Sequence, residues 1–198
     1  MRTTAFRAGL LSLPPMIVML VSVAALVAQS GSSPAAARSA DAQKIARGKY
    51  LATIGACNDC HSPKIDAAQT PDPKRPFSGR PSTTMAPSQN PKEIHASLDL
   101  TAWSGPWGVS YGANLTPDPE TGLKKRYTEA AFIKTLRTGK KPEGEDLLPP
   151  MPWALYKVMS DDDLKAIWAY FQTIPAIRNN VKSGELPKRG ARPAAPKK

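Results

Sequence analysis

Apolar side chains recur at helical spacing in SDDDLKAIWAYFQTI, the segment that spans residues 160–174. Residues three and four apart share one face of an α-helix, so this spacing predicts an amphipathic helix. Ser160 suits the N-cap position, and Asp163 three residues later resembles a capping box. Pro175 cannot continue a helix and marks its end. The predicted buried stripe is Leu164, Ile167, Trp168, Phe171 and Ile174.

A second helix is predicted from Thr128 to Thr138. Thr128 suits the N-cap, and Gly139 suits the left-handed residue that often follows the last turn of a helix. The predicted apolar face consists of Phe132, Ile133 and Leu136.

A third helix is predicted from Asp41 to Ile54, with Asp41 as its N-cap. Its face at helical spacing consists of Ile45, Gly48, Leu51 and Ile54. Glycine in mid-helix costs stability relative to alanine. Gly48 is therefore either a tolerated glycine or the site of a close crossing with another helix.

Residues 62–127 are rich in Pro, Gly, Ser and Thr and show little periodicity. A loop of this length is unusual inside a compact domain unless it has a function. Loops that wrap a large flat cofactor would bury their apolar side chains against it. The pattern thus predicts an all-α fold with a long loop insertion.

The stretch ACNDCH, residues 56–61, holds both cysteines of the chain and one of its two histidines. A structural disulfide, a redox dithiol, half of a zinc site and a covalent haem attachment are the four interpretations. The spacing C-x-x-C-H is the haem c signature, in which two thiols bind the haem and the histidine binds its iron. A structural zinc site needs four ligands, and a redox dithiol usually accompanies a βαβ pattern that is not evident nearby.

The net charge of +11 lies mostly at the two ends of the chain. Residues 1–40 carry a net charge of +3 and residues 178–198 a net charge of +6, which leaves +2 for residues 41–177. A nucleic-acid-binding domain should instead carry a basic face on its folded part. The distribution predicts no nucleic-acid partner.

The first 40 residues resemble an export signal, because Arg2 and Arg7 precede an apolar run over about 9–28 and small residues follow. That run also has the length of a membrane anchor. Either interpretation places the following domain outside the cytoplasmic membrane, in the bacterial periplasm, since positive charge stays inside. We expect an export signal or anchor plus linker over 1–40, a folded domain over 41–177, and a basic, Pro-rich, disordered tail over 178–198.

A haem iron bound by His61 has a second face, and methionine is a common ligand there that raises the reduction potential. Met151 lies in LLPPMPW, where neighbouring prolines stiffen the backbone and favour presentation of its sulfur at a fixed place. Met85, Met159 and His95 are the alternatives, and His95 would give a lower-potential site.

Several of these segments together resemble class I c-type cytochromes, and especially the monohaem modules of cytochrome subunits associated with periplasmic alcohol and sugar dehydrogenases. The resemblance implies a small helical fold whose first and last helices cross, with Gly48 against Tyr170 or Trp168. It also implies one covalent haem c. Its ligands would be Cys57 and Cys60 as thioether sites, His61 as proximal ligand and Met151 as distal ligand. The matching segments span 47–175 and are RGKYLATIGACNDCH, PFSGRP, NLTPDPETGL, FIKTLRTGK and LPPMPWALYKVMSDDDLKAIWAYFQTIP.

The predicted function is electron transfer between a periplasmic dehydrogenase and the respiratory chain, without enzymatic activity of the chain's own. Its partners would be redox proteins: a dehydrogenase, other cytochromes or a terminal oxidase. A haem-based sensor or enzyme with a labile sixth ligand is the alternative, and a haem-free zinc or dithiol domain is the third. Candidates for contacts with the haem edge or propionates are Arg80, Trp107, Tyr111 and Asn114.

Overall fold

The computed structural model describes residues 34–187. Residues 1–33 of the predicted export signal or anchor plus linker (1–40) and residues 188–198 of the predicted tail (178–198) lie outside the described residues. Within 34–187, none of the helices has the length and apolar character needed to cross a bilayer.

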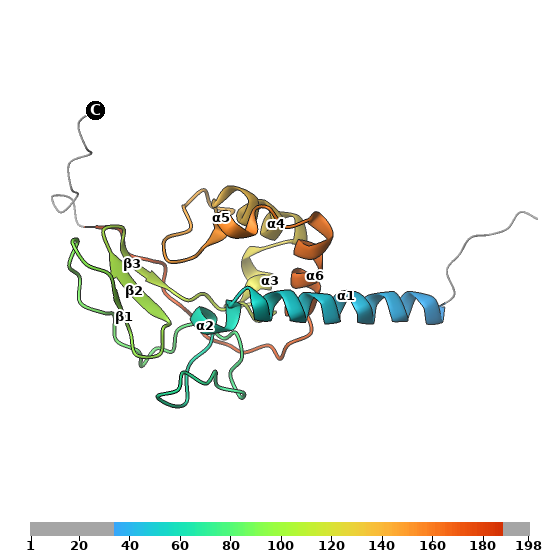
Figure 1. The fold of residues 1–198 in the computed structure, drawn as a ribbon, viewed down its shortest axis with the longest axis horizontal. Helices are drawn as coiled ribbons and strands as arrows, with labels where there is room; N and C mark the ends of the chain where they lie inside the picture. Colours follow the sequence, from blue (N-terminus) through green and yellow to red (C-terminus); the bar gives the residue numbers. More distant parts are fainter. Residues whose placement is uncertain (1–33, 188–198) are drawn as a thin grey trace, which may run out of the picture. The chain divides into compact units, whose positions relative to one another are not determined.

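The first helix, α1, runs from Pro34 to Ile54 and packs extensively against the last helix, α6, which runs from Asp161 to Phe171. The predicted N-cap at Asp41 is wrong, because the helix begins at Pro34. Proline suits the first helical position, and the following alanines are strong helix formers. Figure 1 shows α6 beside α1. Gly48 of α1 lies against Ala166 and Tyr170 of α6.

The crossing at Gly48 leaves no room for a side chain. A Cβ atom there would lie 1.9 Å from the carbonyl oxygen of Ala166 and 2.9 Å from the Cβ of Tyr170. The predicted close crossing is therefore confirmed. The contact includes Tyr170, as the resemblance implied, and the backbone at Ala166 approaches more closely.

The other predicted caps are confirmed. The Thr128 side chain accepts a hydrogen bond from the backbone N–H of Ala131 at the start of α4, Glu129–Thr138, and Gly139 ends that helix with φ of 70°. Ser160 likewise accepts from the N–H of Asp163 at the start of α6. Three short helices complete the helical part: α2 (Cys57–His61), α3 (Leu123–Arg126) and α5 (Trp153–Tyr156).

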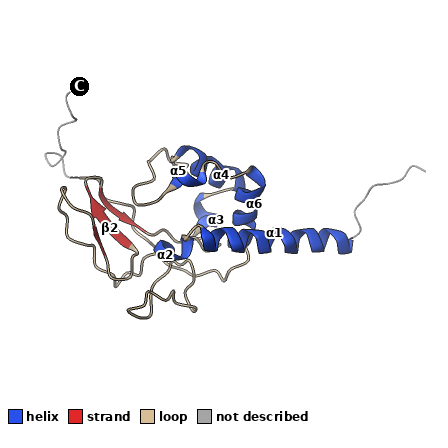
Figure 2. Ribbon diagram, in the orientation of Figure 1, coloured by secondary structure: helices blue, strands red, loops and turns tan. Residues whose placement is uncertain are grey.

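The expectation of an all-α fold is wrong, because the insertion contains a three-stranded antiparallel sheet. The strands β1 (His95–Ala96), β2 (Ala102–Gly105) and β3 (Gly108–Tyr111) pair in the order β1-β2-β3. Figure 2 shows the strands to one side of the helices, with α2 between them.

The sheet was not predicted, because β2 and β3 are short and lack an alternation of apolar and polar residues. Three of four positions in each strand are buried, and several of the buried residues are serine, alanine or glycine. Gly105 pairs with Gly108 across the two-residue connection. Proline and glycine suit such a tight turn, but the same composition also occurs in irregular loops.

Residues 177–187, here called the return segment, run back along β3. The N–H of Val109 donates to the carbonyl of Glu185 at 2.7 Å, and the N–H of Glu185 donates to the carbonyl of Val109 at 2.8 Å. The fully buried Asn114 holds the start of the segment, since its Nδ2 donates to the carbonyl of Ile177 at 2.8 Å. The return segment thereby becomes a wall of the site described next.

Candidate functional site

The motif at 57–61 forms the short helix α2, directly after α1. Ala56 between the two helices has a left-handed backbone with φ of 54°, which turns the chain sharply. The Tyr156 hydroxyl donates to the carbonyl of Gly55 at 2.5 Å. This bond ties α5 to the turn that presents the motif.

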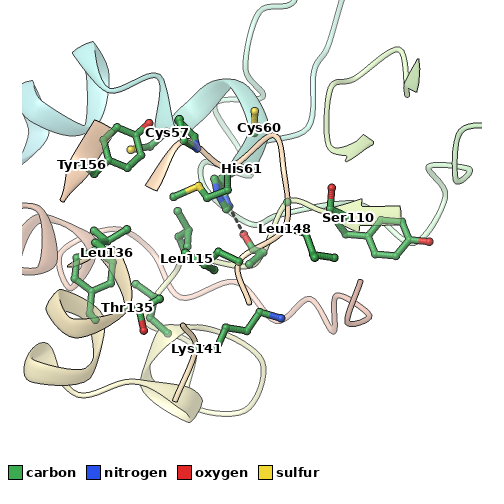
Figure 3. A pocket seen from close by; sticks show the side chains of 18 of the residues that line it. Cys57, Cys60, His61, Ser110, Leu115, Thr135, Leu136, Lys141, Leu148 and Tyr156 are labelled. Carbon is green, nitrogen blue, oxygen red and sulfur yellow. Dashed lines mark hydrogen bonds between the residues drawn. The ribbon is translucent and has the colours of Figure 1, made fainter. Parts of the chain in front are cut away.

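His61 is held in one tautomer and one orientation. Its Nδ1 lies 2.8 Å from the carbonyl oxygen of Ala113. A carbonyl can only accept, so Nδ1 carries the proton and Nε2 keeps its lone pair. The dashed line at His61 in Figure 3 marks this bond. Such an outer hydrogen bond is the usual support of a metal-binding histidine.

The surroundings of His61 favour a neutral imidazole. Burial lowers the pKa of His61, and the positive charges of Arg126 and Lys64 lower it further, against the opposing effect of the hydrogen bond to Ala113. A neutral imidazole is the form that binds a metal ion.

The motif opens into a large, mostly apolar cavity. The space that it encloses, together with the open solvent at its mouth, measures about 1460 Å³. Aliphatic and aromatic walls suit a large flat ligand. The lining includes Leu51, Leu115, Leu123, Tyr127, Phe132, Leu136, Leu148, Ile167 and Phe171.

The structure brings Met151 into the same cavity as Cys57, Cys60 and His61. Met159 also lines it, so the cavity contains two thioethers. Met85 and His95 are not among the lining residues.

Met85 and His95 lie elsewhere in the described part of the chain. Met85 is 84% exposed. His95 lies in β1, with its Nε2 at 2.9 Å from a carboxylate oxygen of Glu93.

The cysteine environment does not suit a redox dithiol. Burial raises the pKa of Cys57 to about 12, and burial also raises the pKa of Cys60. Reactive dithiols require the opposite, a lowered thiol pKa. The two cysteines are free of any disulfide. Among residues 34–187, no three His, Cys, Asp or Glu side chains gather as a metal cluster of the zinc type.

Of the four predicted contacts at the haem edge, Tyr111 lines the cavity, and Arg80, Trp107 and Asn114 are not among its lining residues. The Arg80 guanidinium lies over the Tyr111 ring at 4.6 Å and donates to the carbonyl of Thr84. The Trp107 ring covers Gly105. Asn114 is a structural residue that holds the return segment.

Sequence reasoning missed Arg126, Tyr156 and the return segment as parts of the site. All of them line the cavity. Tyr156 reaches Gly55 across 101 positions of the chain. No local pattern signals a contact of that range.

The residues present fit a haem. The motif, a tautomer-fixed histidine and a thioether share one apolar cavity, and the buried Nε of Arg126 has no hydrogen-bond partner in the described structure. Such a donor needs an acceptor, which a carboxylate-bearing ligand would provide.

No family model matches the chain. Curated relatives nevertheless cover much of it. The cytochrome c subunit of gluconate 2-dehydrogenase from Pantoea cypripedii is 34% identical over 172 residues, which is 85% of this chain and 32% of the relative. The cytochrome c subunit of a quinone-type alcohol dehydrogenase from Gluconobacter oxydans is 32% identical over 135 residues, or 68% of this chain and 22% of the relative.

The cytochrome subunit of fructose dehydrogenase from Gluconobacter japonicus is 31% identical over 135 residues, again 68% of this chain and 22% of the relative. The chain thus spans about a third or less of the length of these relatives. The predicted resemblance to cytochrome subunits of dehydrogenases is confirmed. The relatives also agree with the prediction of an electron-carrying cytochrome rather than an enzyme.

Proposed function

We propose that this chain is an electron-transfer c-type cytochrome with one covalent haem c. Cys57 and Cys60 form the thioether bonds, and His61 and Met151 bind the iron from opposite sides. The observation that carries the proposal is the His61–Ala113 hydrogen bond at 2.8 Å inside a cavity that also contains both thiols and Met151.

Hydrogen bonds support His61 and the turn before Cys57. The Ala113 carbonyl keeps the proton on Nδ1 of His61 and directs Nε2 toward the metal position. The Tyr156 hydroxyl fixes the turn before Cys57 through Gly55. These contacts would limit the movement of His61 and of the motif when bound haem changes its oxidation state.

Bound haem supplies one-electron exchange at its iron. The protein controls the potential through the axial ligands, the hydrogen bond to His61 and the exclusion of water by the apolar walls. With His61 and Met151 as iron ligands, the protein would leave no position at the metal for a substrate. A His/Met pair also gives a higher potential than two histidines would.

The relatives support a proposal for the physiological role. We propose that the protein works in the periplasm, where it passes electrons between a dehydrogenase and the respiratory chain. Its partners would be redox proteins that meet it in a small, transient interface. The described part, 34–187, has a net charge of +4, well below the +11 of the whole chain, so electrostatic steering contributes little to the encounter.

The test is covalent haem retention. The full chain, produced with a haem c maturation system, should keep haem after denaturing electrophoresis and contain one iron per chain. The matched variant Cys57→Ser/Cys60→Ser should lose the covalent haem. Colourless wild-type protein with two free thiols would contradict the proposal.

Carbon monoxide binding distinguishes the proposed function from the alternative, a sensor or enzyme with a labile sixth ligand. Reduced wild-type protein at neutral pH should bind it poorly if Met151 occupies the sixth position. Ready binding would favour the alternative.

A further inference from the structure

The charged side chains that line the cavity, apart from His61, are all cations. They are Arg126 at the end of α3, Lys141 just after α4, and Lys182 in the return segment. No aspartate or glutamate lines the cavity. Three separate elements thus bring positive charge to an otherwise apolar site, which favours a ligand with negatively charged groups.

Among these three side chains, Arg126 is the one with a buried nitrogen that lacks a hydrogen-bond partner. Its Nε is buried without a hydrogen-bond acceptor in the described structure. No described carboxylate forms an ion pair with it, and its guanidinium lies 5.8 Å from the centre of the Tyr127 ring. A buried donor without an acceptor has lost its hydrogen bonds to water and gained none in return, and this is most unfavourable for a charged group. The site is therefore incomplete without an acceptor.

The other cations fit less well. Lys141 already forms an ion pair with Glu145 at 2.8 Å. Lys182 is exposed at the cavity lining. Arg80, the candidate from the sequence, also has a buried Nε without an acceptor, but it does not line the cavity, and its guanidinium donates to the Thr84 carbonyl and lies over the Tyr111 ring.

We propose that Arg126 binds a propionate carboxylate of the haem, with Lys182 adding positive charge where the return segment lines the cavity. This inference rests on the proposed function. A planar guanidinium donates two parallel hydrogen bonds to a carboxylate, which suits Arg126 better than a lysine. The pairing neutralises a negative charge near the iron. It therefore favours the reduced form, whose iron carries one positive charge less, and raises the reduction potential.

The experiment is a redox titration of holoprotein at fixed ionic strength. Arg126→Gln removes the charge, Arg126→Lys keeps the charge without the planar fork, and Lys124→Gln removes an exposed charge from the same helix. Arg126→Gln should lower the midpoint potential, Arg126→Lys should restore it in part, and Lys124→Gln should leave it near wild type. Lys182→Gln should lower it less than Arg126→Gln.

A second readout reports on the carboxylate itself. Redox-difference infrared spectra should show a shifted carboxylate stretch in Arg126→Gln and Arg126→Lys, and an unchanged one in Lys124→Gln. If Arg126→Gln does not retain haem, Arg126→Lys still tests the pairing by this shift.

Three outcomes overturn the inference: an unchanged potential in Arg126→Gln, a decrease equal to that of Lys124→Gln, or an unmoved carboxylate stretch in both Arg126 variants. All three are measured on protein that contains haem. Failure of the proposed function is a different result, because the wild type would then contain no covalent haem at all.

Discussion

Gly48 of α1 and Ala166 of α6 are in such close contact that a Cβ atom on Gly48 would lie 1.9 Å from the Ala166 carbonyl oxygen. Helix backbones approach this closely only where one of them lacks a side chain. The crossing positions α1, which leads directly into the motif helix α2. The geometry of the site thus depends on a residue that does not line the cavity.

Gly48→Ala should destabilise the protein. In an exposed helix this change would be favourable by about 1 kcal/mol. Here the new methyl group meets backbone and must separate the helices, which costs about 1–3 kcal/mol as overpacking does. Thermal unfolding of holoprotein measures the effect, with Lys49→Ala, an exposed position of the same helix, as the control. A rise in the unfolding temperature would show that the helices are not in contact at Gly48.

The two thioethers in the cavity can be told apart by matched substitutions that conserve volume. Met151→Leu should abolish the far-red sulfur-to-iron band, lower the midpoint potential and permit carbon monoxide binding, because a methionine ligand raises the potential and closes the sixth position. Met159→Leu should keep the band and change stability by less than about 1.5 kcal/mol. The visible spectrum of each variant decides. Loss of the band in Met159→Leu alone would transfer the ligand role to Met159.

Helix ends were predictable because capping is local. Thr128, Ser160 and Gly139 each act within a few residues of their own position, so the caps can be recognised without tertiary information. The start of α1 was predicted wrongly because that prediction also rested on a local signal. Asp41 resembles an N-cap residue, but the helix extends back to Pro34. The sheet was missed because Gly105 and Ser104 are buried without an apolar pattern.

The residues of the site likewise divide into those that the sequence predicts and those that it does not. Cys57, Cys60 and His61 are adjacent in the chain, and Met151 has a distinctive proline-rich setting. The structure places all four in one cavity, and their ligand roles stay predictions. The predicted apolar faces of α4 and α6 supply part of the walls. Arg126, Tyr156 and the return segment were not predictable, because they reach the cavity through contacts of long sequence separation.

Asp99 should make the insertion sensitive to acid. Burial alone would raise the pKa of Asp99, but hydrogen bonds from Ser97, Thr84 and Thr101 outweigh it and lower the pKa overall. The hydroxyls of Thr84 and Ser97 donate at 2.5 and 2.6 Å. A lowered folded-state pKa means that the carboxylate stabilises the fold above its unfolded pKa of about 3.9. This stabilisation is lost as the pH falls through the folded-state value.

The corresponding measurement is unfolding free energy against pH. Asp99→Asn removes the titration with little change of shape, so its stability should fall less steeply below pH about 4 than that of the wild type. Asp72→Asn, at an exposed turn of the same insertion, is the control and should leave the steep acid branch in place. Identical acid branches in wild type and Asp99→Asn would exclude Asp99 as its source.

Asn114→Ala should release the return segment from β3. The Asn114 amide donates to the Ile177 carbonyl at 2.8 Å and accepts from the Thr116 N–H at 3.0 Å, and the loss of such buried bonds costs about 1–3 kcal/mol for each group left unpaired. Hydrogen exchange of the Glu185 amide, which bonds Val109, should therefore accelerate more than exchange of amides in α6. Asn180→Ala, at an exposed position of the segment, should change neither rate. Equal acceleration at Glu185 and in α6 would mean that Asn114 supports the whole fold rather than this wall of the cavity.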